Sequence, residues 1–192
     1  MSGLPQVHPA GKPAHSPPDA RHQSITVNHR LTVFIEQPPE FVRKLYPSAV
    51  WRMDPDERAV YLTFDDGPIP EVTPWVLDLL DKYDIKATFF MVGDNIRKHP
   101  DEFQMVVERG HRIGNHTFNH LRGFEYNFKD YLANAEKANE VMKTDLFRPP
   151  HGHMGWTQYM ILKRRYKIIM WDLVTRDYSK KLLSLIHISE PT

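Results

Sequence analysis

The sequence predicts an α/β fold with a parallel sheet or barrel, and three observations lead to this expectation. Short apolar runs rich in β-branched and aromatic residues alternate with segments of helical period. Proline and glycine separate these segments where helices are expected to begin and end. Polar residues suited to chemistry follow several of the apolar runs. Strands and helices that alternate in this way form βαβ units, which pack as parallel sheets or barrels.

The first elements are expected as strand 59–64, helix 72–82, strand 87–92, helix 100–109 and strand 111–115. The first two strands are short, mainly apolar runs, and helix 100–109 has proline in its first turn and glycine after its end. One helical stripe supports the 72–82 helix. Its residues are Val72, Trp75, Val76, Leu79 and Leu80.

The remaining elements are expected as helix 129–143, strand 146–148, helix 156–165 and strand 167–171. The 129–143 helix is expected to turn one stripe inward, made of Leu132, Ala135, Ala138 and Met142. Five aromatic residues are expected in the core rather than on a sugar-binding surface. They are Trp75, Phe89, Phe90, Trp156 and Trp171.

Composition excludes several classes of protein. The formal net charge of +1 provides no basic surface for nucleic acid, and the absence of cysteine excludes disulfides and thiolate metal sites. No apolar run approaches the roughly 20 residues of a membrane span. The N-terminus also lacks the apolar core of a signal peptide, so a cytoplasmic location is expected for the chain as written.

The two ends of the chain differ from its middle. Residues 1–30 are rich in proline, histidine and serine and are expected to be disordered, and residues 31–58 are expected to lead into a domain at 59–182. Residues 183–192 resemble the translation of an adapter used in sequencing libraries, so they are expected to be non-native. We therefore expect the natural sequence to break off near Leu182.

Polar residues follow the predicted strands at the same end. Asp65 and Asp66 follow the first strand, His116 follows the third, and Arg148 ends the fourth. Asp172 and Asp177 follow the fifth. Because the carboxyl ends of the strands meet at one rim of an α/β barrel, these side chains are expected to converge on an active site.

The residue types at this rim suit metal-dependent hydrolysis. His116 and His120 provide two imidazoles four residues apart, and one carboxylate of the Asp65-Asp66 pair would complete an open catalytic metal site. The other carboxylate could take a proton from the attacking water.

Each motif also has a simpler interpretation. Asp65-Asp66-Gly67-Pro68 could form only a turn. His116 and His120 could be a solvated pair on a helix, and Arg148-Pro149-Pro150 a stiff loop. Asp172 and Asp177 could be surface carboxylates. The combination of all these motifs, in order and on one rim, favours the catalytic interpretation.

The same motifs resemble those of a known family. Thr63-Phe64-Asp65-Asp66-Gly67-Pro68, His116-Thr117 with His120, Arg148-Pro149-Pro150-His151-Gly152 and Arg176-Asp177-Tyr178 are similar to four of the five motifs of polysaccharide deacetylases. These are the NodB-homology domains of carbohydrate esterase family 4. The resemblance implies a distorted (β/α) barrel of about seven strands, of which the five predicted strands are present.

The resemblance also implies a role for each motif residue. Asp65 would be the general base, oriented by Arg148, which Asp177 would hold. Asp66, His116 and His120 would bind one divalent metal ion, most often zinc, with cobalt, nickel or manganese as alternatives. The three remaining residues would serve substrate binding: Pro150, His151, whose nearby backbone N–H would help to bind the oxyanion, and Tyr178, which would wall the sugar groove.

The fifth motif of the family is missing. It normally supplies the histidine that protonates the leaving amine. Leu185-Ile186-His187 matches its letters but lies within the suspected adapter and only ten residues after Asp177, so we do not assign His187 as the acid. We therefore expect an incomplete barrel and little or no turnover from the chain as written.

The function expected from the resemblance is removal of N-acetyl groups from a GlcNAc-containing polysaccharide, such as bacterial peptidoglycan or a chitin-like glycan. Two alternatives stay open. One is an O-acetyl esterase on acetylated polysaccharide, and the other is a fragment that binds metal or glycan without turnover. The partners expected are an acetylated polysaccharide and no nucleic acid, the chain is expected to be a monomer, and family members often act at the cell envelope.

Overall fold

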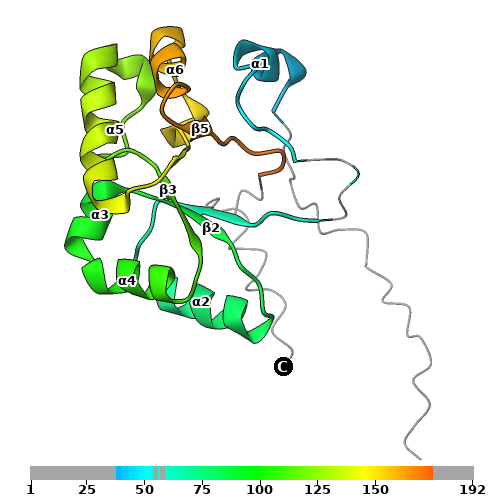
Figure 1. Cartoon of the computed structure of the whole chain (residues 1–192), viewed down its shortest axis with the longest axis vertical. Helices are drawn as coiled ribbons and strands as arrows, with labels where there is room; N and C mark the ends of the chain where they lie inside the picture. The colour runs from blue at the N-terminus through cyan, green and yellow to red at the C-terminus, as the bar shows by residue number, and fades with distance from the viewer. Residues whose placement is uncertain (1–37, 54–55, 57–58, 175–192) are drawn as a thin grey trace, which may run out of the picture. The chain divides into compact units, whose positions relative to one another are not determined.

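The computed structural model describes residues 38–53, 56 and 59–174, which form one parallel sheet flanked by helices (Figure 1). The sheet has five strands in the order β1-β2-β3-β4-β5. The strands are β1 (Thr63–Asp65), β2 (Thr88–Met91), β3 (Arg112–Asn115), β4 (Leu146–Phe147) and β5 (Lys167–Ile168). The helices are α1 (Glu40–Leu45), α2 (Thr73–Lys82), α3 (Gly93–Lys98), α4 (Pro100–Glu108), α5 (Phe128–Met142) and α6 (Trp156–Leu162), with 3₁₀ turns η1 (Gly123–Glu125) and η2 (Pro150–Gly152).

All the strands and helices predicted between residues 59 and 174 are present, so the expected α/β class is confirmed. The strands are shorter than predicted. In particular, β1 begins at Thr63 rather than at residue 59, because its first partner is Thr88 at the start of β2. Val60 and Tyr61 precede that pairing and are exposed.

Two helices were not predicted from the sequence. Helix α1 (Glu40–Leu45) buries none of its residues, so no apolar stripe marks it. Helix α3 follows β2 directly and, at six residues, is too short for its single buried apolar side chain, Ile96, to show a period.

The parallel register places the carboxyl ends of the strands at one edge. Asp65 lies beside Phe90, Met91 beside Asn115, and Asn115 beside Phe147. The residues that follow β1, β3 and β4 therefore emerge next to one another, as the sequence predicted.

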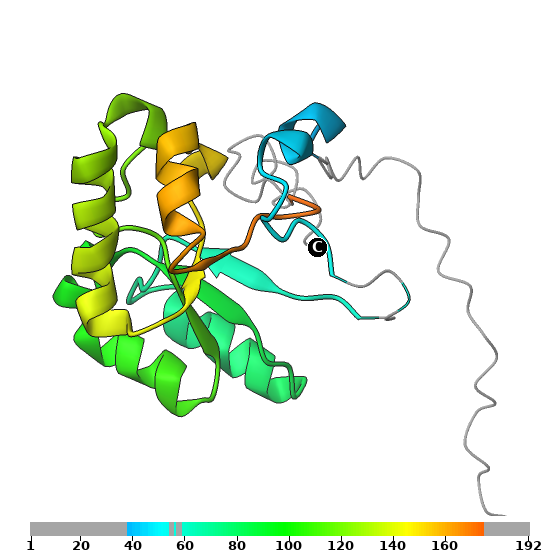
Figure 2. The ribbon, with the colours of Figure 1, turned by 45° about the horizontal axis from the view of Figure 1, so that its top comes forward.

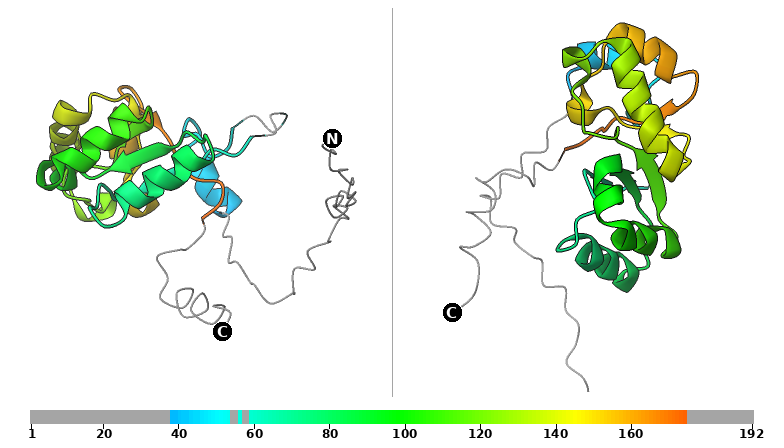
Figure 3. Two further views of the ribbon diagram at one scale, coloured as in Figure 1. Left: turned by 90° about the horizontal axis from the view of Figure 1, so that it is seen from below. Right: turned by 90° about the vertical axis from the view of Figure 1, so that its left-hand side faces the viewer.

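Helices α2 to α6 are linked by contacts, and α5 contacts both α3 and α6 (Figures 2 and 3). Helices α2 and α4 contact each other, as do α5 and α6. The first core cluster joins α2–α4 to β2, with Leu77, Phe89, Met91 and Val106 among its buried residues. Helix α5 contributes Ala138 and Met142 to this cluster and Ala135 to the other, as its predicted inward stripe requires.

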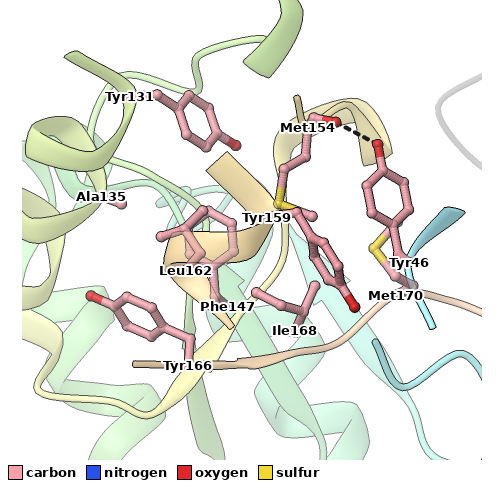
Figure 4. Close-up of a cluster of buried hydrophobic side chains, with 10 residues drawn as sticks. All are labelled: Tyr46, Tyr131, Ala135, Phe147, Met154, Tyr159, Leu162, Tyr166, Ile168 and Met170. Carbon is pink, nitrogen blue, oxygen red and sulfur yellow. Dashed lines mark hydrogen bonds between the residues drawn. The ribbon is translucent and has the colours of Figure 1, made fainter. Parts of the chain in front are cut away.

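The second core cluster lies around β4, β5 and α6 and includes a residue from far upstream (Figure 4). Tyr46, which follows α1, is buried here against Tyr159, with ring centroids 5.1 Å apart. Its hydroxyl donates a hydrogen bond to the Met154 carbonyl oxygen. From the sequence, residues 31–58 are expected only to lead into the domain, and none of them is predicted to lie in the core.

The segment after Tyr46 also pairs with the sheet. Val50 N donates to Ile168 O and Val50 O accepts from Met170 N, both at 2.8 Å. Ile169 N instead donates to Phe147 O of β4. Because alternate residues of a strand bond to opposite neighbours, Val50 occupies the side of β5 that faces away from β4.

Two of the aromatic residues expected in the core are exposed, so that prediction was wrong for them. Trp75 on α2 is 64% exposed and Trp156 is 57% exposed, whereas Phe89 and Phe90 are buried as predicted and Trp171 is partly buried. Helix α2 is apolar on more than one face, and its buried positions are Thr73, Leu77 and Leu80. Packing against α4 determines which face of α2 is buried, and the apolar pattern of α2 alone contains no information about that contact.

None of the helices in the described part of the chain combines the length and the apolarity that crossing a bilayer requires.

Candidate metal centre

Asp66, His116 and His120 come together at the carboxyl edge of the sheet. Asp66 Oδ1 lies 3.4 Å from His116 Nε2 and 3.0 Å from His120 Nε2. One potential ligand atom from each of these residues lies within 4.8 Å of the others. His116 is buried, whereas His120 is partly buried and Asp66 is exposed, so the group is open to solvent on one side.

The two imidazoles are carried by a loop, so the alternative of a solvated helical pair is wrong. Thr117 and His120 have left-handed backbone conformations, with φ of 64° and 55°. Side chains hold the turn in place: Thr117 N donates to Asn115 Oδ1 at 2.8 Å, and Leu121 N to Thr117 Oγ1 at 3.1 Å. Asn134 Oδ1 accepts from the next two amides, those of Phe118 and Asn119. This bracing offsets the strain of the left-handed residues.

Asp66 is also in the left-handed region, with φ of 73°. Its amide donates to Phe90 O at 3.1 Å, and its carbonyl oxygen accepts from Asn95 Nδ2 at 2.6 Å. The change of backbone direction after Asp65 sends these two neighbouring carboxylates to different partners.

A hydrogen bond assigns the tautomer of His116. Its Nδ1 lies 2.7 Å from the Arg148 carbonyl oxygen, which can only accept, so Nδ1 carries the proton and donates it. On a neutral imidazole, Nε2 then presents a lone pair to the Asp66 carboxylate. A proton or a cation between these two acceptors is needed to make their contact favourable.

The donor set fits a divalent transition metal. When the two Nε2 atoms carry protons, hydrogen bonds from His116 and then from His120 hold the pKa of the Asp66 carboxyl well below its ordinary value, so the group is anionic. Two imidazole nitrogens and one carboxylate oxygen are the ligand types that zinc takes at catalytic sites. The second nitrogen of His116 is anchored by a backbone carbonyl, as is usual for metal-binding histidines.

Asp65 faces Arg148 rather than the imidazoles. Arg148 Nη1 lies 2.7 Å from Asp65 Oδ1 and 2.8 Å from Thr63 Oγ1. Its Nε donates to Ile169 O at 3.2 Å and its Nη2 to Met170 O at 2.8 Å. These contacts fix the position of the guanidinium group.

Arg148 is buried, whereas Asp65 is accessible. The Arg148 side chain is 3% exposed and its guanidinium lies 4.1 Å from the centre of the Phe90 ring. Burial lowers the pKa of Arg148, and the Asp65 carboxylate opposes this change. The Asp65 side chain is 34% exposed, so a buried cation pairs with a carboxylate that solvent can reach.

Of the residues expected to bind substrate, two lie beside the metal ligands and one cannot be placed. The His151 ring centroid is 4.7 Å from that of His120, and Pro150 is buried next to it in η2. Asp177 and Tyr178 lie outside the described residues, as do residues 1–37 and 183–192.

Asp172, expected at the same rim, has a different set of partners. Its carboxylate pairs with Arg43 at 3.0 Å and with Arg52 at 2.8 Å. Both arginines belong to the upstream segment that packs on β5. The sequence interpretation of Asp172 as a rim residue missed these partners, because they lie more than 100 residues away in the chain.

A pocket of about 280 Å³ adjoins the metal ligands and includes residues that the sequence analysis missed. Besides Asp66 and His120 it is lined by Val92, Asp94, Asn95 and Asn119. Asp94 and Asn95 follow β2, so the polar residues after that strand were a usable signal. A shallower pocket of about 400 Å³ lies at the other end of β3, beside Arg112 and Thr144, away from the three ligands.

Comparison with known proteins gives a consistent picture. A family model described as polysaccharide deacetylase matches residues 52–165. The chain is 37% identical over 128 residues to a peptidoglycan-N-acetylglucosamine deacetylase of Bacillus cereus, covering 64% of this chain and 60% of the relative. It is 28% identical to the peptidoglycan-N-acetylmuramic acid deacetylase PdaC of Bacillus subtilis, covering 67% of this chain and 28% of the relative.

Two solved structures show the same fold. The Bc1960 peptidoglycan N-acetylglucosamine deacetylase superposes with a TM-score of 0.62 at 30% identity, covering 70% of this chain and 65% of that one. A mutant of BA3943, a CE4 family pseudoenzyme, superposes with a TM-score of 0.62 at 26% identity, covering 65% and 48%. The described sheet corresponds to part of a barrel.

Proposed function

The chain belongs to the polysaccharide deacetylase family, and on that premise we propose that the protein removes N-acetyl groups from a GlcNAc-containing polysaccharide. Peptidoglycan is the first candidate substrate, because the relatives at 37% and 35% identity are named as peptidoglycan deacetylases, and a chitin-like glycan is the second. One observation supports the chemistry above all others. The Asp66, His116 and His120 cluster adjoins a carboxylate, Asp65, that a buried arginine holds.

Asp66, His116 and His120 would hold one divalent ion, with zinc as the first candidate and cobalt, nickel or manganese as alternatives. Such an ion, when bound, acts as a Lewis acid and lowers the pKa of water to about 7. The His116 Nδ1–H bond to the Arg148 carbonyl keeps Nε2 aimed at the site.

Asp65 would act as the general base. Its Oδ1 is bonded to Arg148 Nη1, which leaves Oδ2 to accept a proton from the attacking water. Because Arg148 is fixed by Thr63 and by two backbone carbonyls, it orients this carboxylate. A positioned base typically contributes about 10²–10⁴-fold to the rate.

The η2 turn supports a role for the His151 amide in stabilising the oxyanion. Pro150 has no N–H, and the amides of Gly152 and His153 are bonded to Pro149 O and Pro150 O. The His151 amide is therefore the group in this turn that we assign to the substrate oxygen. Pro150 would shape the turn and the His151 side chain would contact the sugar. Tyr178 would wall the groove and Asp177 would support Arg148.

Acetate release tests this proposal. The chain is stripped with a chelator, reloaded with zinc, and incubated with acetylated chitooligosaccharides or peptidoglycan. We expect acetate release that is slow for the chain as written but depends on zinc, and that the Asp65→Asn change removes. Acetylated xylan measured in parallel distinguishes an O-acetyl esterase, for which ester cleavage would exceed amide cleavage.

A second candidate is a protein that binds metal or glycan without turnover. The similarity to a CE4 family pseudoenzyme favours it. Stoichiometric zinc binding without acetate release from any of these substrates would support this candidate over the first.

A further inference from the structure

A row of aromatic rings leads away from the metal centre. From His120 the ring centroids follow at 4.7 Å to His151, then 6.1 Å to His153, then 5.4 Å to Phe124. His151 and His153 are exposed, and Phe124 is 67% exposed. The row therefore joins a metal-ligand candidate to an apolar ring that solvent reaches on most of its surface.

Two turns carry the outer rings, and a buried side chain of α6 joins the first turn to Gly155, which follows the second turn. Phe124 lies in η1, and His153 directly follows η2. Gln158 of α6 is 5% exposed, and its Nε2 donates to Gly123 O at 2.7 Å and to Tyr126 O at 2.9 Å. Its Oε1 accepts from Gly155 N at 2.8 Å.

The turns also touch directly. Gly123 N donates to His153 O at 3.2 Å, and a Cβ atom on Gly123 would come within 2.4 Å of that oxygen. Glycine is thus required for this approach. The backbone positions that carry the Phe124 and His153 rings are consequently fixed before any ligand arrives, which lowers the entropic cost of binding.

The exposure of Phe124 is not explained by core packing. A ring that is 67% exposed buries little apolar area, so its contribution to folding is small. Residues on turns that a rigid scaffold positions beside a site often serve binding. The C–H face of a pyranose ring is apolar and flat, and it stacks on an aromatic ring while the hydroxyl groups stay in water.

We propose that Phe124 and His153 form a carbohydrate-stacking subsite, which binds a sugar of the glycan next to the one whose acetyl group lies at the metal centre. The inference rests on the proposed function for the identity of the glycan. Phe124 is the specificity-determining residue, because it favours polymers over isolated acetylated sugars. Gln158 is a positioning residue that acts through the two turns.

Binding of a GlcNAc pentamer to the zinc-loaded Asp65→Asn protein tests the subsite, because this background prevents turnover during calorimetry. Adding Phe124→Ala is expected to weaken binding about tenfold, as loss of a central aromatic contact does. Adding Phe124→Trp is expected to preserve or strengthen binding, since the ring is retained. Adding Trp75→Ala removes an equally exposed ring on α2 and is expected to leave binding unchanged.

All variants should retain stoichiometric zinc, which shows that the metal centre is intact. Equal affinity with and without the Phe124 ring would overturn the subsite, and so would a failure of the zinc-loaded protein to bind the pentamer. Acetate release by the wild-type chain is scored separately. If acetate is released but the Phe124 ring has no effect on pentamer binding, the subsite proposal alone is wrong. If pentamer binding depends on the ring but no acetate is released, the proposed catalysis alone is wrong.

Discussion

The two halves of the site are built in different ways. The metal ligands, Asp66, His116 and His120, are held by loops whose bracing side chains, Asn115, Asn134 and Asn95, lie 2, 16 and 29 positions from the residues they contact. The Asp65–Arg148 pair instead joins residues 83 positions apart and depends on the backbone carbonyls of residues 169 and 170.

Those carbonyls are themselves positioned by the upstream segment. Val50 bonds to Ile168 O and Met170 N, and Asp172 joins Arg43 and Arg52 to the end of β5. The comparison teaches that metal binding and proton transfer should respond differently to changes far from the site. Disturbing residues 46–52 should reach Asp65 through β5 and the Arg148 guanidinium, and should affect the metal ligands less, because His116 contacts only the backbone carbonyl of Arg148.

The largest expected effect is on metal binding itself. His116→Ala removes a ligand whose orientation the Arg148 carbonyl sets, so the bound divalent ion should fall from about one per chain to none. Metal content after dialysis measures it. His99→Ala, at the α3–α4 junction, is the matched control and should retain the ion. Undiminished metal in His116→Ala would contradict the assignment.

The next effect separates the neighbouring carboxylates. Asp65→Asn leaves the contacts among Asp66, His116 and His120 unchanged and removes the proton acceptor. Bound zinc should be unchanged, while the wild-type rate of acetate release should fall about 10²–10⁴-fold. Asp66→Asn should lose zinc instead. The reverse pattern would mean that the roles of Asp65 and Asp66 are exchanged.

A smaller effect is expected from the upstream strand. Val50→Pro removes the N–H that bonds to Ile168 O, so unfolding free energy should fall by about 1–3 kcal/mol, with zinc still bound. Urea unfolding measures the change. Lys44→Ala, which breaks only an exposed pair with Glu40, serves as the control and should shift stability by less than about 0.5 kcal/mol. Equal midpoints for Val50→Pro and wild type would show that the pairing with β5 is dispensable.

The smallest effect is expected at Asp172. Its ion pairs with Arg43 and Arg52 are partly exposed, so Asp172→Ala should cost about 1 kcal/mol or less, and the cost should shrink as salt screens the charges. Thermal melting at low and high ionic strength checks this. A loss of several kcal/mol would mean that the cluster is the main anchor of the upstream segment, ahead of Tyr46 and Val50.

Much of the fold could be predicted from the sequence because its signals are local. The alternation of apolar runs and helical stripes gave the order of β1 to β5 and of α2, α4, α5 and α6. The polar residues at strand ends indicated which side chains would meet, since parallel strands share one carboxyl edge. Ala135, Ala138 and Met142 are buried as their spacing predicted.

Other features depended on contacts that no local pattern contains. Trp75 and Leu77 lie on the same apolar helix, and packing against α4 selected Leu77 for the core. Tyr46 and Val50 gave no period that pointed to β5, and the partners of Asp172 lie at the other end of the described chain.

The sequence alone thus determined the order of the elements and the set of residues at the rim, because periodicity and strand polarity are written within a few consecutive positions. Only the tertiary structure decided which carboxylate faces the imidazoles, because that depends on the left-handed turn at Asp66 and on the contacts of Phe90 and Asn95. It also decided what supports Arg148, because those contacts join strands that are adjacent in space and distant in the chain.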